Sequence, residues 1–219
     1  GPVIVEVEDG VYEEAITLQE VPSMSATNTV TFRGESLDAT LDTLTASNGD
    51  PTLRMDGADY YSFEHITIQN TNGNDYAIQF LGGSDYNRFE DCVIRINDAN
   101  STSTLDCLVY SGSGTTDEYN TFRNNTFENG SYGMYWYGQN TITMEQGNVI
   151  EGNEFLNQYQ YGARLYYQSG LNFDKNTITS NSTYGFAYGV YAYYCDNSNF
   201  TSNHVYGPED SGWPLYGMR

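Results

Sequence analysis

The chain has 219 residues, and its 29 Asp and Glu against 8 Lys and Arg give a formal net charge of −21. Such a field repels phosphate backbones, which excludes nucleic acid as a partner, and no apolar stretch approaches the ~20 residues of a membrane-spanning helix, which excludes membrane insertion. The 21 Tyr and 10 Phe nevertheless supply enough apolar surface for a sizeable core.

The chain opens in strand-like sequence at 3–18 (VIVEVEDGVYEEAITL), which is followed by NTVTFRG at 28–34. From residue 63 onward, a six-residue unit recurs that begins with Phe or Ile, and Gly, Asn, Asp and Ser turns follow it. The copies of this unit are FEHITI (63–68), FEDCVI (89–94), FRNNTF (122–127), IEGNEF (150–155), FDKNTI (173–178) and FTSNHV (200–205).

A second strand-like unit lies between these copies and begins at Tyr76, Cys107, Tyr132, Tyr161, Tyr188 and Tyr216, with a spacing of 25 to 31 residues. Each period therefore holds at least two short strands, and no helical periodicity is sustained. Such a repeat predicts an all-β solenoid in which each coil pairs in parallel with the next, about 4.8 Å away. We expect about seven coils in a single domain over residues 1–219.

Four asparagines share one register in the first unit. Asparagine tolerates left-handed backbone geometry, and its amide both donates and accepts, so stacked copies can hydrogen-bond from coil to coil. The pattern predicts a structural ladder that gives way to apolar stacking at Ile66 and Cys92; a row of glycan-binding amides is the alternative. The ladder residues are Asn125, Asn153, Asn176 and Asn203.

Alternation in the second unit predicts an exposed aromatic face. If Met134 and Val190 point into the core, their neighbours in the strand point outward. Tyrosine combines a flat apolar ring with a hydroxyl and suits sugars, although stacked tyrosines could simply stabilise one another. The candidate glycan-binding residues are Tyr110, Tyr135, Tyr137, Arg164, Tyr166, Tyr191 and Tyr193.

Acidic residues recur directly after the first Phe or Ile of the first unit. Carboxylates of adjacent coils in register would repel one another, and a divalent cation would relieve that repulsion, so calcium is a possible ligand. A solvated acidic face is the alternative, and no other cofactor is expected. The candidate metal ligands are Glu64, Glu90, Glu151 and Asp174.

The N-terminal stretch 3–18, the NTVTFRG segment and the F-x-x-N-x-[IFV] repeats resemble the pectin-lyase-like superfamily of right-handed parallel β-helices. More narrowly, they are similar to the β-helix repeats of very large secreted bacterial surface proteins. The resemblance implies a capping helix before the first coil and further coils after the last. We therefore expect a fragment, uncapped at its C-terminal end, of a longer protein that is secreted or bound to a bacterial cell surface.

The leading hypothesis for function is a non-catalytic extracellular scaffold, adhesin-like, that binds glycans or cell-surface polymers. A polysaccharide lyase or glycoside hydrolase fragment is the alternative. A lyase needs a cationic base near a group that neutralises the substrate carboxylate, but Arg164 and Lys175 fall on different strands. The signatures that the resemblance implies for a hydrolase, such as Asn-Thr-Asp and Gly-His-Gly, are missing. A structural spacer is the third hypothesis. The balance of residues favours a chain without catalytic activity.

Overall fold

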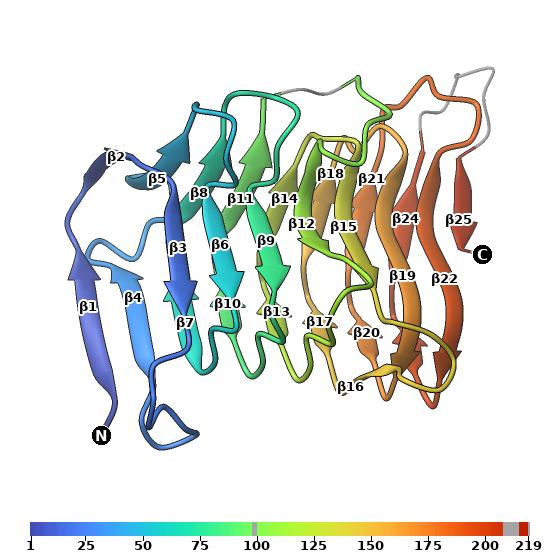
Figure 1. The fold of residues 1–219 in the computed structure, drawn as a ribbon. Coiled ribbons are helices and arrows are strands. Elements are labelled where there is room, and N and C mark those ends of the chain that lie inside the picture. The colour runs from blue at the N-terminus through green and yellow to red at the C-terminus, as the bar shows by residue number, and fades with distance from the viewer. Residues whose placement is uncertain (98–99, 208–214, 219) are drawn as a thin grey trace.

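The computed structural model of the protein describes residues 1–97, 100–207 and 215–218. Within these residues all regular structure is β, and the chain winds as a right-handed parallel β-helix of about 8 turns. Figure 1 shows the coils stacked side by side, with the two termini at opposite ends of the stack. The described part of the chain contains no helix long and apolar enough to cross a membrane.

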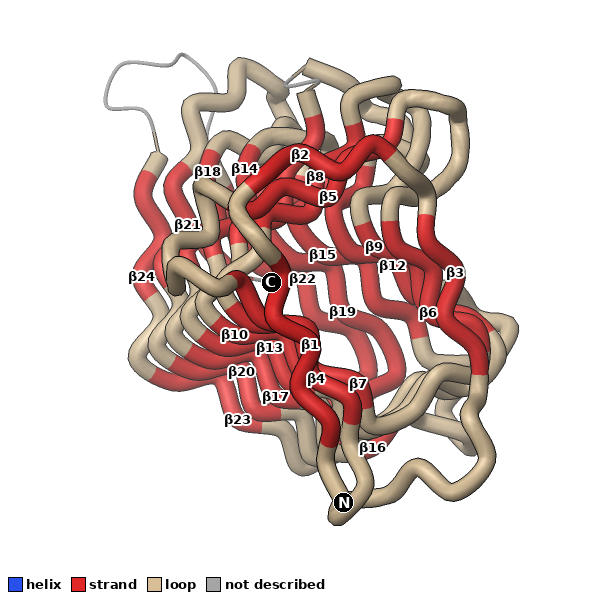
Figure 2. Tube along the Cα trace, turned by 90° about the vertical axis from the view of Figure 1, so that its left-hand side faces the viewer, coloured by secondary structure: helices blue, strands red, loops and turns tan. Residues whose placement is uncertain are grey.

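Three parallel sheets form the walls of the solenoid, as the view in Figure 2 shows. Sheet A contains β1 (Val3–Val7), β4 (Val30–Gly34), β7 (Tyr61–Glu64), β10 (Arg88–Glu90), β13 (Thr121–Arg123), β17 (Val149–Glu151), β20 (Asn172–Asp174) and β23 (Asn199–Thr201). Sheet B contains β2 (Gly10–Glu13), β5 (Asp42–Ala46), β8 (Thr67–Asn70), β11 (Val93–Ile96), β14 (Thr126–Glu128), β18 (Glu154–Leu156), β21 (Thr177–Thr179) and β24 (His204–Tyr206).

Sheet C carries the longest strands of the fold, because the second sequence unit extends to nine residues in β19 (Tyr161–Ser169) and β22 (Tyr188–Asp196). A short extra strand, β16 (Glu145–Gln146), pairs with the end of β19. The other strands of sheet C are β3 (Ile16–Gln19), β6 (Leu53–Asp56), β9 (Ile78–Leu81), β12 (Cys107–Ser111), β15 (Tyr132–Tyr137), β19 (Tyr161–Ser169), β22 (Tyr188–Asp196) and β25 (Tyr216–Met218).

Each coil holds three strands because the first sequence unit folds as two strands and not as one. In FEDCVI, β10 ends at Glu90 and β11 begins at Val93, with Asp91 between them in the left-handed region (φ 54°). Most copies place a residue other than glycine in this conformation, so the turn carries no clear sequence signal. The change of sheet shows only as a one-residue shift in the alternation, because the inward residues Phe89, Cys92 and Ile94 are spaced by three and then two residues.

Stacked aromatic rings fill the core along sheet A. Phe63, Phe89 and Phe122 occupy the same register on successive coils, with ring centroids 5.0 and 4.9 Å apart. The coil spacing of about 4.8 Å suits offset ring stacking, which explains why the repeat begins so often with Phe. Burial of each ring contributes about 1.5–3 kcal/mol, and this column holds the coils together.

The three cysteines are free thiols. Cys92 and Cys107 are buried among apolar side chains, and burial raises the pKa of the Cys92 thiol to about 12. Both behave as small apolar residues without thiolate chemistry.

Candidate functional site: the outer face of sheet C

The seven residues predicted to bind glycan share the outer face of sheet C. One column runs in register through Tyr110, Tyr135, Arg164 and Tyr191, on β12, β15, β19 and β22. A second column beside it contains Tyr137, Tyr166 and Tyr193. Their strand neighbours, including Met134 and Val190, are buried as alternation requires. We call these seven residues the tyrosine face.

The prediction that the tyrosine face lies exposed is wrong for most of its members. Tyr193 is 44% exposed, whereas the other six residues are half-buried and expose less of their surface to solvent. The rings cover one another from coil to coil, with centroids 5.4 Å apart for Tyr110 and Tyr135 and 4.8 Å apart for Tyr137 and Tyr166. Coil spacing and ring-stacking distance are nearly equal, so a tyrosine column shields much of its own surface.

A further row of tyrosines, which sequence reasoning did not assign to the site, flanks the tyrosine face. Tyr132, Tyr161 and Tyr188 stack with centroid distances of 5.1 and 5.3 Å. They begin the repeated strands, and Tyr132 meets Tyr135 edge-to-face at 5.7 Å. The sequence could have predicted this row, because tyrosine is the first residue of nearly every copy of the second unit.

Arg164 lies inside this aromatic surface. Its Cζ atom is 5.3 Å from the ring centroids of Tyr135 and Tyr161 and 5.0 Å from that of Tyr166. Its Nε and Nη2 donate to the Tyr166 hydroxyl at 3.2 and 2.8 Å. Burial has the largest single effect on the pKa of Arg164 and lowers it, but the hydrogen bond to Tyr166 and the electrostatic interactions with the surrounding tyrosines together outweigh burial, so the pKa is raised.

No carboxylate of the described residues forms an ion pair with Arg164. Cation–π contacts and tyrosine hydroxyls therefore hold the guanidinium in place. Such contacts leave the guanidinium without a carboxylate partner in the described residues, and the same holds for Arg95, which donates to Gln69 Oε1 at 3.0 Å.

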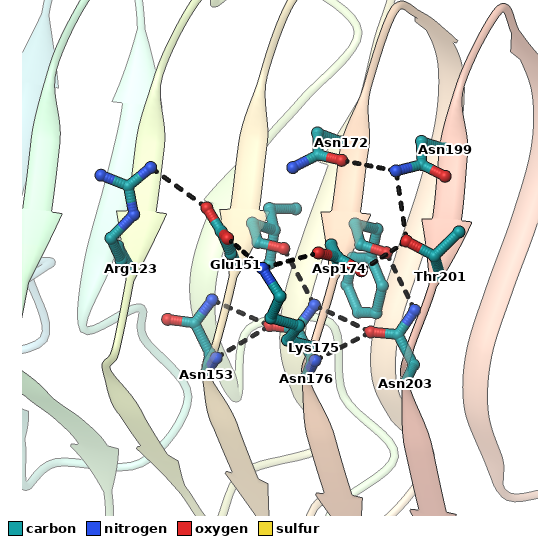
Figure 3. A network of polar contacts seen from close by, with 12 residues as sticks. Arg123, Glu151, Asn153, Asn172, Asp174, Lys175, Asn176, Asn199, Thr201 and Asn203 are labelled. Atoms are coloured by element: carbon teal, nitrogen blue, oxygen red, sulfur yellow. Dashed lines mark hydrogen bonds and ion pairs between the residues drawn. The ribbon is translucent and has the colours of Figure 1, made fainter.

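The candidate metal ligands lie on the outer face of sheet A, in one column with arginines of the chain. Glu90 pairs in register with Arg123, and Arg123 with Glu151. Glu151 accepts from Arg123 Nη2 at 3.1 Å and from Lys175 Nζ at 2.9 Å, and Lys175 also lies 3.2 Å from Asp174 (Figure 3). Hydrogen bonds from Lys175 and Arg123 lower the pKa of Glu151.

At the N-terminal side of this column, Glu64 lies in register with Arg33 and Glu90, and Glu90 forms an ion pair with Arg88. The described residues contain no group of three or more Asp, Glu, His or Cys side chains placed to hold a metal ion. Arg123 and Lys175 thus occupy the position beside Glu151 and Asp174 where a divalent ion was predicted, while calcium binding at Glu64 and Glu90 stays a prediction.

We expect calcium to stabilise the protein no more than monovalent salt does. The carboxylates of Glu151 and Asp174 already accept from Lys175, so added ions act on them through general screening. Thermal unfolding in calcium chloride and in sodium chloride of equal ionic strength should give the same melting temperature. A calcium-specific rise that saturates with concentration would instead indicate a bound ion.

The four predicted ladder asparagines stack in the turn between sheets A and B, and Figure 3 shows three of them. Asn153 Oδ1 accepts from the backbone N–H and Nδ2 of Asn125 at 2.9 and 3.0 Å, and Asn153 Nδ2 donates to Asn176 Oδ1 at 3.0 Å. Asn176 repeats the pattern with Asn203. At the other end Asn125 Oδ1 accepts from the Cys92 N–H. The amides are thus used within the fold.

A second asparagine ladder, which sequence reasoning missed, lies where sheet C turns into sheet A. Asn120 Oδ1 accepts from the Asn87 N–H at 2.9 Å, and Asn148 Oδ1 accepts from the Asn120 N–H at 2.9 Å. These asparagines stand two residues before the inward Phe or Ile of each coil, at Phe89, Phe122 and Ile150 in turn. That offset is the signal that could have revealed the ladder.

The comparisons with known proteins agree with this architecture. The family model for the right-handed β-helix region matches residues 106–217, which is more than half of the chain. The chain therefore belongs to this family. The pectin-lyase-like resemblance is thereby confirmed at the level of fold. No curated protein matches the chain.

Three solved structures share the fold. Pectin methylesterase from Yersinia enterocolitica is 12% identical, with 98% of this chain and 89% of that chain covered and a TM-score of 0.51. The alginate lyase from Paenibacillus sp. str. FPU-7 is 12% identical, with coverage of 97% and 92% and a TM-score of 0.50. ORF18 of Geobacillus virus E2 is 14% identical, with coverage of 95% and 54% and a TM-score of 0.52. Identity this low shows a shared fold alone.

Proposed function

We propose that the chain is a non-catalytic, extracellular β-helix scaffold, secreted or on a bacterial cell surface, that binds glycans through the tyrosine face. The observation that carries the proposal is Arg164, a cation held among tyrosine rings without a carboxylate partner in the described residues. A guanidinium in this setting donates readily to hydroxyl or carboxylate oxygens of a ligand. The pectin methylesterase and alginate lyase that share the fold support a carbohydrate ligand.

The stacked geometry determines how a sugar would bind. Because Tyr110, Tyr135 and Tyr137 stack on neighbouring rings, they present mainly ring edges and hydroxyls to solvent. Tyr193 is more exposed and meets Tyr166 edge-to-face at 5.6 Å. A glycan would therefore accept hydrogen bonds along the columns and stack at the exposed end near Tyr193.

We expect the Tyr193→Ala and Arg164→Gln variants to weaken glycan binding about tenfold each, which corresponds to about 1–2 kcal/mol for a good contact. A glycan array would identify the ligand, and calorimetric titration would give the affinities. Tyr86→Ala is the matched control, because Tyr86 is 45% exposed and stacks on Tyr60 away from the tyrosine face. Equal losses in all three variants would contradict a specific site.

The alternative function is a polysaccharide lyase, and the contact between Arg164 and the Tyr166 hydroxyl favours it over a hydrolase. A hydroxyl that accepts two guanidinium N–H groups resembles an acid–base group placed beside a charge-stabilising cation. Incubation with uronate polymers should release unsaturated products if this reading is correct, and a hydrolase would release new reducing ends without them. A folded chain that neither binds nor cleaves glycans would be a structural spacer.

A further inference from the structure

Two carboxyl groups lie inside the solenoid at the corner where sheet C turns into sheet A. Asp117 precedes β13 and Glu145 begins β16, and both are fully buried. The Ser111 hydroxyl bridges them, at 2.6 Å from Asp117 Oδ2 and 3.5 Å from Glu145 Oε1. Two buried negative charges this close would be very costly without a compensating cation.

The surroundings supply hydrogen-bond donors to both carboxyls. The Ser84 N–H donates to Asp117 Oδ1 at 2.9 Å, and the Asp117 N–H donates to Glu145 Oε1 at 3.2 Å. Gln168 Nε2 donates to Glu145 Oε2 at 3.0 Å, and Asn148 Nδ2 in turn fixes Gln168 through its Oε1 at 3.1 Å. Both carboxyls are thus held rigidly in place.

The surroundings supply no positive charge. Neither carboxyl forms an ion pair with any lysine or arginine of the described residues. The titratable groups on the adjoining segments are all acids. The charge of Asp85 raises the pKa of Asp117, and Glu118 follows Asp117 in the chain. Cys195, on the following coil, lies in register with Gln168. Neutralisation must therefore come from a proton.

We propose that Asp117 and Glu145 hold one proton between them at neutral pH, and that the fold depends on this proton. With the proton on Glu145 Oε1, a chain of donors runs from Glu145 to the Ser111 hydroxyl and on to Asp117 Oδ2. Burial, more than the adjacent Asp117, raises the pKa of Glu145 well above its usual range. Burial also raises the pKa of Asp117 to about 6.

The sign of the pH effect follows from these directions. Both pKa values lie above the unfolded values of 3.8 for Asp and 4.5 for Glu, so the folded protein binds more protons than the unfolded chain. This contribution to stability is complete below the unfolded pKa values, at about pH 4 and lower, and is lost as the pH rises, through about 6 for Asp117 and further for Glu145. Each proton of difference raises the unfolding constant about tenfold per pH unit.

The Asp117→Asn variant tests the proposal. The side-chain amide introduced at this position can accept from Ser84 and donate to Ser111, so the hydrogen bonds survive while one titrating group is removed. We expect the ratio of the unfolding constants of parent and variant to rise by up to about tenfold per pH unit between about pH 4 and 6 and then to level off. Denaturant unfolding at a series of pH values measures this ratio.

Glu154→Gln is the matched control, because it removes the same charge at an exposed position of β18. The ratio of the unfolding constants of the parent and Glu154→Gln should vary much less with pH. A ratio for Asp117→Asn that stays constant across the range, or that matches the control, would overturn the proposal.

An infrared spectrum of the parent protein provides a second test, which does not depend on a variant that folds. At neutral pH the folded chain should show the C=O stretching band of a protonated carboxylic acid, and unfolding should abolish it. A spectrum without this band would refute the shared proton. Assignment to Glu145 requires that Glu145→Gln, where it folds, removes the band.

Discussion

Replacing Asn153 with alanine is expected to lower the free energy of unfolding by about 3 kcal/mol. The side chain accepts from the backbone and side chain of Asn125 and donates to the Phe122 carbonyl at 3.0 Å and to Asn176. Truncation leaves the buried Asn125 N–H without its acceptor and removes the side-chain donors from the Phe122 C=O and from Asn176 Oδ1. Each buried group that loses its partner costs about 1–3 kcal/mol, and the methyl group cannot replace either bond.

Denaturant unfolding of Asn153→Ala and of Asn172→Ala would measure the effect. Asn172 lies on the outer face of sheet A and makes an exposed side-chain bond with Asn199 at 2.9 Å (Figure 3), so its loss should cost less than about 1 kcal/mol. Asn153→Asp separates the two roles of the amide, because the carboxylate can accept but cannot donate. Similar stabilities for all three variants would mean that the ladder contributes little.

The repeat in the sequence predicted the coils because each coil must bury the same side chains in the same register. Phe89 and Phe122 stack only if their strands pair without a shift, so one pattern reports both strand and register. The ladder positions were visible for the same reason, since Asn125 and Asn153 perform one task in successive turns. Repetition thus makes the local signal unusually strong.

The sequence was less informative where neighbouring coils interact through their outer faces or through loops. Alternation predicted the direction of Tyr135 but could not reveal that the Tyr110 ring of the preceding coil and the Tyr137 ring of its own strand stack against it. The buried pair was not predicted either. Asp117 and Glu145 lie in connecting segments of unequal length outside the repeated units, so only the folded chain brings them together.

Replacing Gly162 with alanine is expected to destabilise the fold by about 2–3 kcal/mol, the upper range for overpacking. A Cβ atom at this position would lie 2.6 Å from the Gly189 carbonyl oxygen of the next coil and 2.7 Å from Ile178 Cγ2. The backbone oxygen can yield only if the coils separate. Gly133 has the same contacts, 2.5 Å from the Gly162 carbonyl oxygen and 2.7 Å from Phe155.

The same restriction explains why glycine follows tyrosine in the repeated strand. Tyr161 lies on the outer side with the stacked tyrosines and Ala163 points into the core, so the residue between them passes directly beneath the next coil. Gly114→Ala is the control, because a Cβ there meets nothing within 4 Å, and its stability should change by less than about 0.5 kcal/mol. Unfolding midpoints that agree for Gly162→Ala and Gly114→Ala would show that the coils tolerate a side chain, and the Tyr-Gly pattern would then need another cause.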